Sequence, residues 1–193
     1  MTNDPFAAGR ASVTGYLMPE PIRNTHVHRS ALSLIAVAIW ALPAYADVRA
    51  TFTESAPKDR FEITNDGTCA LQGVSVTLDL STSAAGLIFD VTSSGAGVEV
   101  FQPFQLITGG ALVANPPQLR DGMNEVTLDI PNFPAGASIV FTIDVDDTRV
   151  QSDLGQIRVS GSEIEGAYLR VNDQQDSFSN RGRARVATSA CNA

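Results

Sequence analysis

Residues 137–146 read ASIVFTIDVD, and residues 73–80 read GVSVTLDL. Every second side chain is apolar from Ile139 to Val145 in the first stretch, and from Val74 to Leu80 in the second. Alternation with a period of two places one face of a strand against a core and the other face towards water. Both stretches therefore predict β-strands that are buried on one face.

Shorter stretches on both sides continue this pattern, and turn-forming groups such as Asn65-Asp66-Gly67 and Pro134-Ala135-Gly136 separate them. No window of ten or more residues has a helical stripe of apolar side chains. About ten short strands predict one all-β domain, an antiparallel β-sandwich of the immunoglobulin-like type. The further predicted strands are residues 48–53, 61–64, 87–91, 98–101, 104–107, 125–130, 157–160, 168–171 and 183–187.

The N-terminal part of the chain predicts a signal peptide. An apolar run, ALSLIAVAIWAL at residues 31–42, follows the basic residues Arg23 and Arg29 and precedes an A-Y-A sequence that ends at Ala46. A run of 12 residues is short for a membrane span, which takes about 20. We expect cleavage after Ala46, no membrane span afterwards, a single domain at residues 47–193, and a periplasmic or extracellular product. The segment before the run is long, so Met18 is an alternative start.

The two cysteines, Cys69 and Cys191, both lie after the predicted cleavage site. An even number of cysteines in an exported chain predicts one disulfide, which would tie the C-terminal strand across the domain. A free thiol and an intermolecular link are the alternatives.

The remaining composition excludes several classes of function. The net charge of −8 argues against a nucleic-acid partner, and residues 47–193 contain no histidine, so a Ser-His-Asp triad, a Cys-His pair and a His-ligated zinc site are excluded. We therefore expect a protein that is not an enzyme. A hydrolase built on two carboxylates is the alternative, although the same residues contain no tryptophan to grip a sugar.

Three acidic residues end the strand predicted at residues 137–146. Asp144 and Asp146 share its outer face, and Asp147 begins the next loop. Calcium prefers six to eight oxygen ligands, so the three residues predict a candidate Ca²⁺ site, with Glu54, Asp59 or Asp153 as sources of further oxygens. A solvated strand end whose acids discourage edge pairing is the alternative. The run Lys58-Asp59-Arg60 itself is expected at a solvated hairpin tip.

Arg181, Arg183 and Arg185 alternate along the last predicted strand and would line one face of it. This stripe could hold an anionic polysaccharide or a lipid head group. The alternative is pairing within the chain, with Glu163 and Glu165 or with the three aspartates.

Two resemblances add to these predictions. FEITNDGTCALQGVSVTLDL at residues 61–80 is similar to a strand–turn–strand unit of immunoglobulin-like bacterial domains. The segments APKDRFEI (56–63), GLIFDVTSSGAGVEVFQPFQLI (86–107) and FTIDVDDT (141–148) resemble small exported proteins of marine alphaproteobacteria that are labelled aggregation factor core protein.

The second resemblance implies a surface or extracellular protein of adhesion, with calcium as a candidate requirement and a protein or polysaccharide at the cell surface as partner. Together with the absences above, it predicts an exported, non-catalytic surface or interaction module. The alternatives are the carboxylate-based secreted hydrolase and a periplasmic structural protein without a small ligand.

Overall fold

The computed structural model describes residues 14–15, 46–97, 100–149 and 158–188. Contacts divide the chain into two units, Met1–Trp40 and Ala41–Ala193, and only Thr14 and Gly15 of the first are described. The predicted signal peptide therefore falls almost wholly outside the described residues and stays a prediction. Within the described ranges, no helix has the length and apolar character needed to cross a membrane.

The second unit is all-β, as predicted. Its described residues form ten β-strands and one short 3₁₀ helix, and every strand pairing is antiparallel. The elements are β1 (Ala46–Thr53), β2 (Asp59–Asn65), β3 (Leu71–Asp79), β4 (Ile88–Asp90), β5 (Gln105–Thr108), η1 (Gly110–Leu112), β6 (Glu125–Phe133), β7 (Ser138–Asp146), β8 (Tyr168–Val171), β9 (Gln174–Ser177) and β10 (Arg183–Thr188).

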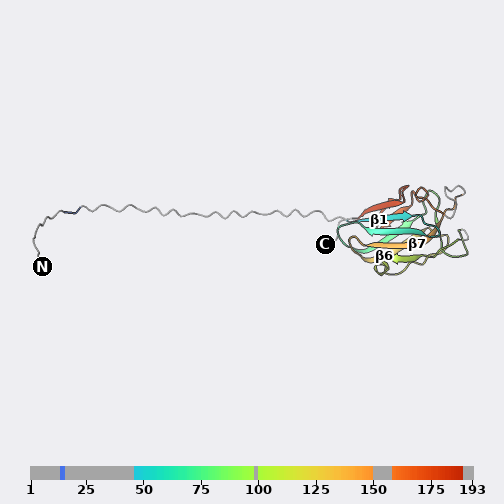
Figure 1. Ribbon diagram of the computed structural model, residues 1–193, viewed down its shortest axis with the longest axis horizontal. Coiled ribbons are helices and arrows are strands. Elements are labelled where there is room, and N and C mark those ends of the chain that lie inside the picture. Colours follow the sequence, from blue (N-terminus) through green and yellow to red (C-terminus); the bar gives the residue numbers. More distant parts are fainter. Residues whose placement is uncertain (1–13, 16–45, 98–99, 150–157, 189–193) are drawn as a thin grey trace, which may run out of the picture. The chain divides into compact units, whose positions relative to one another are not determined.

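The strands form two sheets. The larger sheet has the order β10-β1-β2-β7-β4, and β5 pairs with β7 beside β4. The smaller sheet has the order β6-β3-β8-β9. Figure 1 shows β10, β1, β2 and β7 side by side in the larger sheet. Two packed antiparallel sheets make a β-sandwich.

The core lies between the two sheets and consists of the alternating apolar side chains. In β7, Ile139, Phe141, Ile143 and Val145 are all fully buried. The ring of Phe141 stacks on Phe61 of β2 at 5.2 Å between centroids, and Phe104 covers its other side at 4.9 Å. Aromatic contacts at these distances contribute beyond the area they bury. The alternation therefore identified the core face of the central strands correctly.

Two strands of the smaller sheet differ from the prediction, and the position of each strand in the sheet explains the difference. The prediction ended one strand at residue 130, before Pro131, but β6 continues to Phe133. Proline lacks an N–H, which an edge strand such as β6 tolerates. The second strand, β9, was missed because all four of its residues are polar and exposed. The turn at Asn172, with φ of 51°, folds β9 back onto β8 and sets its pairing.

Two predicted strands are wrong within the described residues. Arg158, Val159 and Ser160 form no strand, although Val159 is fully buried, and Val100 and Phe101 also lie outside any strand. Residue 157 and residues 98–99 fall outside the description. An alternation this short indicates only that one side chain is buried. A segment without regular secondary structure can bury one side chain as well as a strand can.

Asn65, at the end of β2, ties the two sheets together. Its side chain is fully buried, and Nδ2 donates to Phe133 O in the smaller sheet and to Cys69 O, each at 2.9 Å. Its Oδ1 accepts from Gly67 N at 3.0 Å and closes the predicted Asn-Asp-Gly turn. Cys69 lies two residues after this turn, whereas Cys191 lies outside the described residues, so their disulfide remains a prediction.

We predict that Asn65→Ala lowers the free energy of unfolding by roughly 2 kcal/mol, because it leaves buried carbonyl groups without a donor. Urea denaturation measures the change. Asn132→Ala is the matched control, since Asn132 is exposed and bonds only to the exposed side chain of Gln72; its effect should stay within about 0.5 kcal/mol. Equal losses in the two variants would contradict the role of Asn65.

Candidate functional site

The three predicted acids lie where the sequence placed them but are not solvated. Asp144 and Asp146 sit on the face of β7 opposite Ile143 and Val145, and Asp147 follows the strand. Their exposed fractions are only 1%, 1% and 3%. The alternative of a solvated strand end is therefore wrong. A buried carboxylate is costly unless something compensates its charge.

Asp90, at the end of β4, is a fourth buried acid that the sequence analysis missed. It is 1% exposed and lies opposite Asp144 in the register between β4 and β7. Residues directly opposite in an antiparallel pair have Cβ atoms about 4.5–5.5 Å apart. The alternation in the segment around Asp90 is short, so only the register could have brought it to Asp144.

Asp59, at the start of β2, is the fifth buried acidic residue in this region. It was expected at a solvated hairpin tip, but it is 3% exposed and opposite Ile143. Its Oδ2 accepts from Val145 N at 3.1 Å, and its Oδ1 accepts from Ser55 N at 3.3 Å. Asp59 is therefore a source of carboxylate charge near β7, as the sequence analysis had considered. We call the five residues Asp59, Asp90, Asp144, Asp146 and Asp147 the acidic end.

Three of the five residues of the acidic end form no ion pair with a described residue. In the described part of the chain, no Lys or Arg forms an ion pair with Asp59, Asp144 or Asp147. Asp79, the other buried aspartate, is ion-paired with Arg170. Both carboxylate oxygens of Asp147 and Oδ2 of Asp144 are buried without a hydrogen-bond partner among the described residues. Buried polar atoms nearly always have a partner, so this environment favours protonation of the carboxylates or binding of a cation.

The pKa values of two carboxyl groups respond to this environment. Burial, together with repulsion from Asp144, raises the pKa of Asp59 to about 8. Burial raises the pKa of Asp144 to about 7, and the charges of Asp146 and Asp90 add to the rise. Both groups therefore hold their protons at pH values where an exposed carboxyl is ionised.

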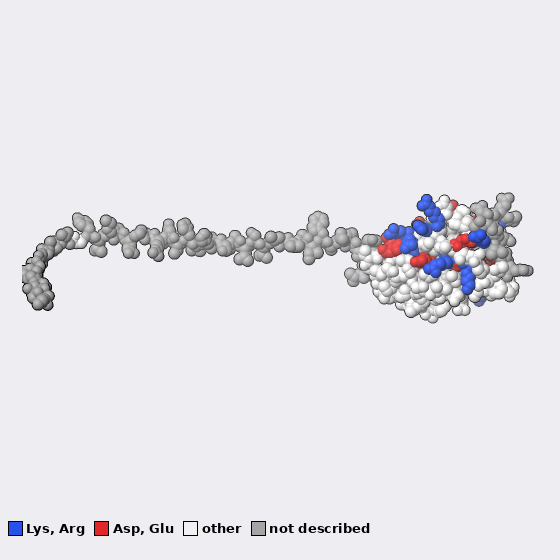
Figure 2. Space-filling view, viewed as in Figure 1, with Lys and Arg blue, Asp and Glu red and all other residues white. Residues whose placement is uncertain are grey.

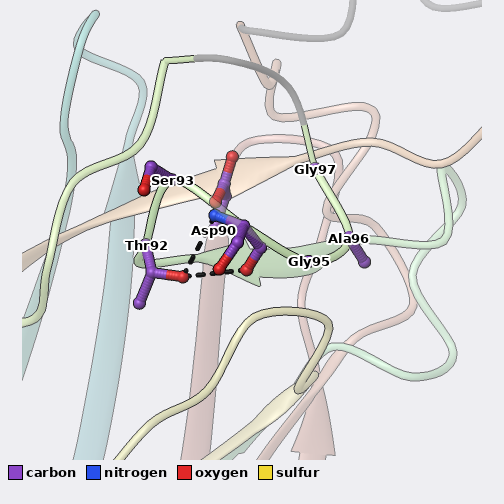
Figure 3. A pocket seen from close by; sticks show the side chains of 7 residues that line it. Asp90, Thr92, Ser93, Gly95, Ala96 and Gly97 are labelled. Atoms are coloured by element: carbon purple, nitrogen blue, oxygen red, sulfur yellow. Dashed lines mark hydrogen bonds between the residues drawn. The ribbon is translucent and has the colours of Figure 1, made fainter.

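A polar pocket of about 400 Å³ opens beside Asp90, lined by Asp90 and by residues 92–97. Figure 3 shows Asp90 facing the loop that runs from Thr92 to Gly97. A Cβ on Gly97 would lie 2.4 Å from Asp90 Oδ2, so only glycine lets the backbone approach this carboxylate. Gly95 and Gly97 are therefore part of the pocket wall.

Asp121 anchors the first half of the same loop. It accepts hydrogen bonds from Val91 N at 2.7 Å, from Thr92 N at 2.8 Å and from the Thr92 hydroxyl. A Cβ on Gly95 would come within 2.7 Å of the Asp121 side chain. Asp121 and the two glycines hold the loop, with its carbonyl groups, against the end of β4.

The described residues do not form a complete set of metal ligands. No group of three His, Cys, Asp or Glu side chains within them is arranged to hold a metal ion. The donor set nevertheless suits a hard cation, because it consists of carboxylates beside a loop of hydroxyl and carbonyl oxygens. Like-charged carboxylates repel one another when no cation is bound, which favours their separation.

The other predicted groups lie elsewhere or fall outside the description. Glu54 pairs with Arg158 at 2.6 Å, and its charge contributes to the raised pKa of Asp59. Asp153 lies outside the described residues. Arg183 and Arg185 are exposed on β10, whereas Arg181 lies in the preceding turn. Arg185 pairs with Asp47 at 2.5 Å, so it does pair within the chain, but with an acid other than the predicted Glu163, Glu165 or the three aspartates.

The raised pKa values predict an unusual dependence of stability on pH. A carboxyl group whose pKa is higher in the folded than in the unfolded chain binds more protons when folded, so stability falls as pH rises from about 4 to about 8. In metal-free buffer the melting temperature should be several degrees higher at pH 5.5 than at pH 8.5.

Asp144→Asn should raise the melting temperature at pH 8.5 and flatten this dependence, because it removes a buried charge. Asp173→Asn is the control, since Asp173 is exposed in the turn after β8. Calorimetry of the three proteins across the pH range is the measurement. A melting temperature that rises with pH in the unmodified protein would contradict the assigned pKa directions.

Comparison with known proteins provides no relative. No family model, no curated protein and no solved structure matches the chain.

Proposed function

We propose that the protein is an exported, non-catalytic surface or interaction module whose β-sandwich is stabilised by Ca²⁺ at the acidic end. The observation that supports this most is the burial of three carboxylate oxygens, on Asp144 and Asp147, without hydrogen-bond partners among the described residues. A divalent cation would compensate their charge and that of their neighbours in one step.

Calcium suits this donor set better than other common metals. It accepts six to eight oxygens in flexible arrangements, so carboxylates from several strands and carbonyl groups from a loop can combine. Magnesium requires near-ideal octahedral geometry, and zinc favours histidine and cysteine, of which residues 47–193 contain no histidine and two cysteines. We assign Asp144, Asp146 and Asp147 as ligands, with Asp90 beside them.

A non-catalytic role is supported by the position of the carboxylates. They come from adjacent strand ends and are buried, whereas a glycosidase places two carboxylates on opposite sides of a substrate cleft. The pocket beside Asp90 has no second carboxylate among its described lining residues. A rigid sheet surface that presents fixed side chains to a partner is the function that this arrangement favours.

A carboxylate-based hydrolase is the competing function, and the pKa of about 7 for Asp144 favours it, because a general acid works best near the operating pH. Turnover of a glycan that is lost in Asp144→Asn but kept in Asp173→Asn would establish it. A structural protein without a small ligand is the third candidate, and it predicts no response to calcium.

Calcium should raise the melting temperature of the purified protein. A metal that binds only the folded state adds about 2.7 kcal/mol at a concentration of 100 times the dissociation constant. Asp146→Asn should abolish most of this gain, while the control Asp173→Asn should keep it. Thermal melts in EDTA and in millimolar CaCl₂ make the comparison. An unmoved melting temperature in the unmodified protein would eliminate the calcium site.

Export should produce a chain that begins at Asp47 and contains one Cys69–Cys191 disulfide. The intact mass of the exported protein would then equal that of residues 47–193 less two hydrogen atoms, and reduction would restore them. Cys69→Ser should block the disulfide and lower the free energy of unfolding, by about 4 kcal/mol in the chain-entropy model. A product that retains residues 1–46, or two alkylatable thiols, would contradict export or pairing respectively.

A further inference from the structure

Four arginines lie on the outer face of the larger sheet, on three neighbouring strands. Arg49 of β1 is directly opposite Arg185 of β10, and Arg183 is two residues along the same strand. Arg60 of β2 is opposite Thr53, four residues from Arg49 on β1. Because side chains two or four residues apart share a face of a strand, all four point away from the core. We call them the arginine face.

Charged side chains gather over this part of the molecule. Figure 2 shows basic and acidic groups together on the side where β1 lies. Arg185 pairs with Asp47 at 2.5 Å, Arg49 with Asp66 at 2.6 Å, and Arg60 with Glu62 at 3.5 Å. These three arginine side chains remain 56%, 37% and 42% exposed, and a guanidinium has five N–H donors, of which even Arg49 uses three in its bonds to Asp66 and Thr51.

Arg183 differs from the other three. Its neighbour across the strand pair is Thr51, and it forms no ion pair with any described residue. It is exposed on β10, at the edge of the sheet. In a chain whose net charge is −8, a guanidinium without an internal anion has no structural explanation among these contacts.

We propose that the arginine face binds a carboxylated polysaccharide. A guanidinium donates two parallel hydrogen bonds to a carboxylate, which a lysine cannot do, and the face contains arginine and no lysine. A pleated face spanning three strands offers an extended polymer several guanidiniums at once. Thr51 and Thr53, which share this face, provide hydroxyl groups for sugar hydroxyls.

The chemistry of the face favours this partner over others. On the described outer positions of β10, β1 and β2 there is no aromatic side chain, which disfavours both neutral sugars and single-stranded nucleic acid, because each is held by stacking. The same positions carry Arg, Asp, Glu, Thr and Ala rather than the large apolar side chains that insert into a membrane surface. The unpaired Arg183, beside three partly exposed arginines, therefore favours an anionic glycan as the partner.

This inference names the partner of the proposed surface module and rests on that function. It does not involve the calcium ligands, so the two can fail independently. Binding is therefore measured in EDTA, with polygalacturonate as the probe and highly methyl-esterified pectin, which has the same backbone with its carboxylates blocked, as the control polymer.

The test compares matched charge reversals in the purified protein. Arg183→Glu should bind polygalacturonate roughly tenfold more weakly, because a charge-assisted hydrogen bond is lost and repulsion is added. Arg183→Lys should recover part of the affinity. Arg120→Glu makes the same charge change on an exposed loop residue away from these strands and should bind normally. Thermal melts check that all three variants remain folded.

Affinity that falls with added NaCl and disappears with the esterified polymer would support the proposal. Equal losses in Arg183→Glu and Arg120→Glu, or equal binding of both polymers, would overturn it. Binding to phosphatidylglycerol vesicles without binding to polygalacturonate would assign the face to a lipid surface instead. If calcium raises the melting temperature but the polymer does not bind, the calcium site stands and the glycan proposal is overturned. If the polymer binds but calcium leaves the melting temperature unchanged, the glycan proposal stands and the calcium site is eliminated.

Discussion

Strand β7 has hydrogen-bonded neighbours along both of its edges, and this constraint shapes the rest of the domain. It pairs with β2 on one side, and with β5 and then β4 on the other. Phe141, at its middle, is consequently enclosed by Phe61 and Phe104 from the two sides. At the C-terminal end of the strand, where β4 is the pairing neighbour, Asp144 and Asp146 are buried as well. The strand that forms the middle of the core therefore ends among buried acidic residues.

The sequence predicted the all-β class and most of the strands because alternation is a local signal. Residues 137–146 and 73–80 differ from the observed β7 and β3 by two residues at most at either end. The sequence could not predict features that depend on contacts with residues elsewhere in the chain. The strand β9 has no apolar residue and exists through its turn and its pairing with β8. Burial of Asp59 depends on Ile143 and Val145 of β7, more than eighty residues later.

The candidate site was predicted in part for the same reason. Asp144, Asp146 and Asp147 are close in sequence, so a spacing argument could find them. Asp90 joins them through a register between β4 and β7, and the nearby loop depends on glycines that no residue pattern linked to a carboxylate. The burial of all five acidic residues could not be predicted from the sequence, because the same residues in an edge strand would face water.

The two ends of β2 experience opposite physical conditions. At its last residue, the neutral amide of Asn65 joins both sheets through hydrogen bonds that are all satisfied. At its first residue, the carboxyl group of Asp59 is buried, and the charges of Asp144 and Glu54 add to the rise of its pKa. Local opening of the sandwich should therefore start at the Asp59 end and weaken towards Asn65, giving amide protons along one strand graded exchange rates. The proposed cation would then slow amide exchange most at the Asp59 end of β2 and least near Asn65.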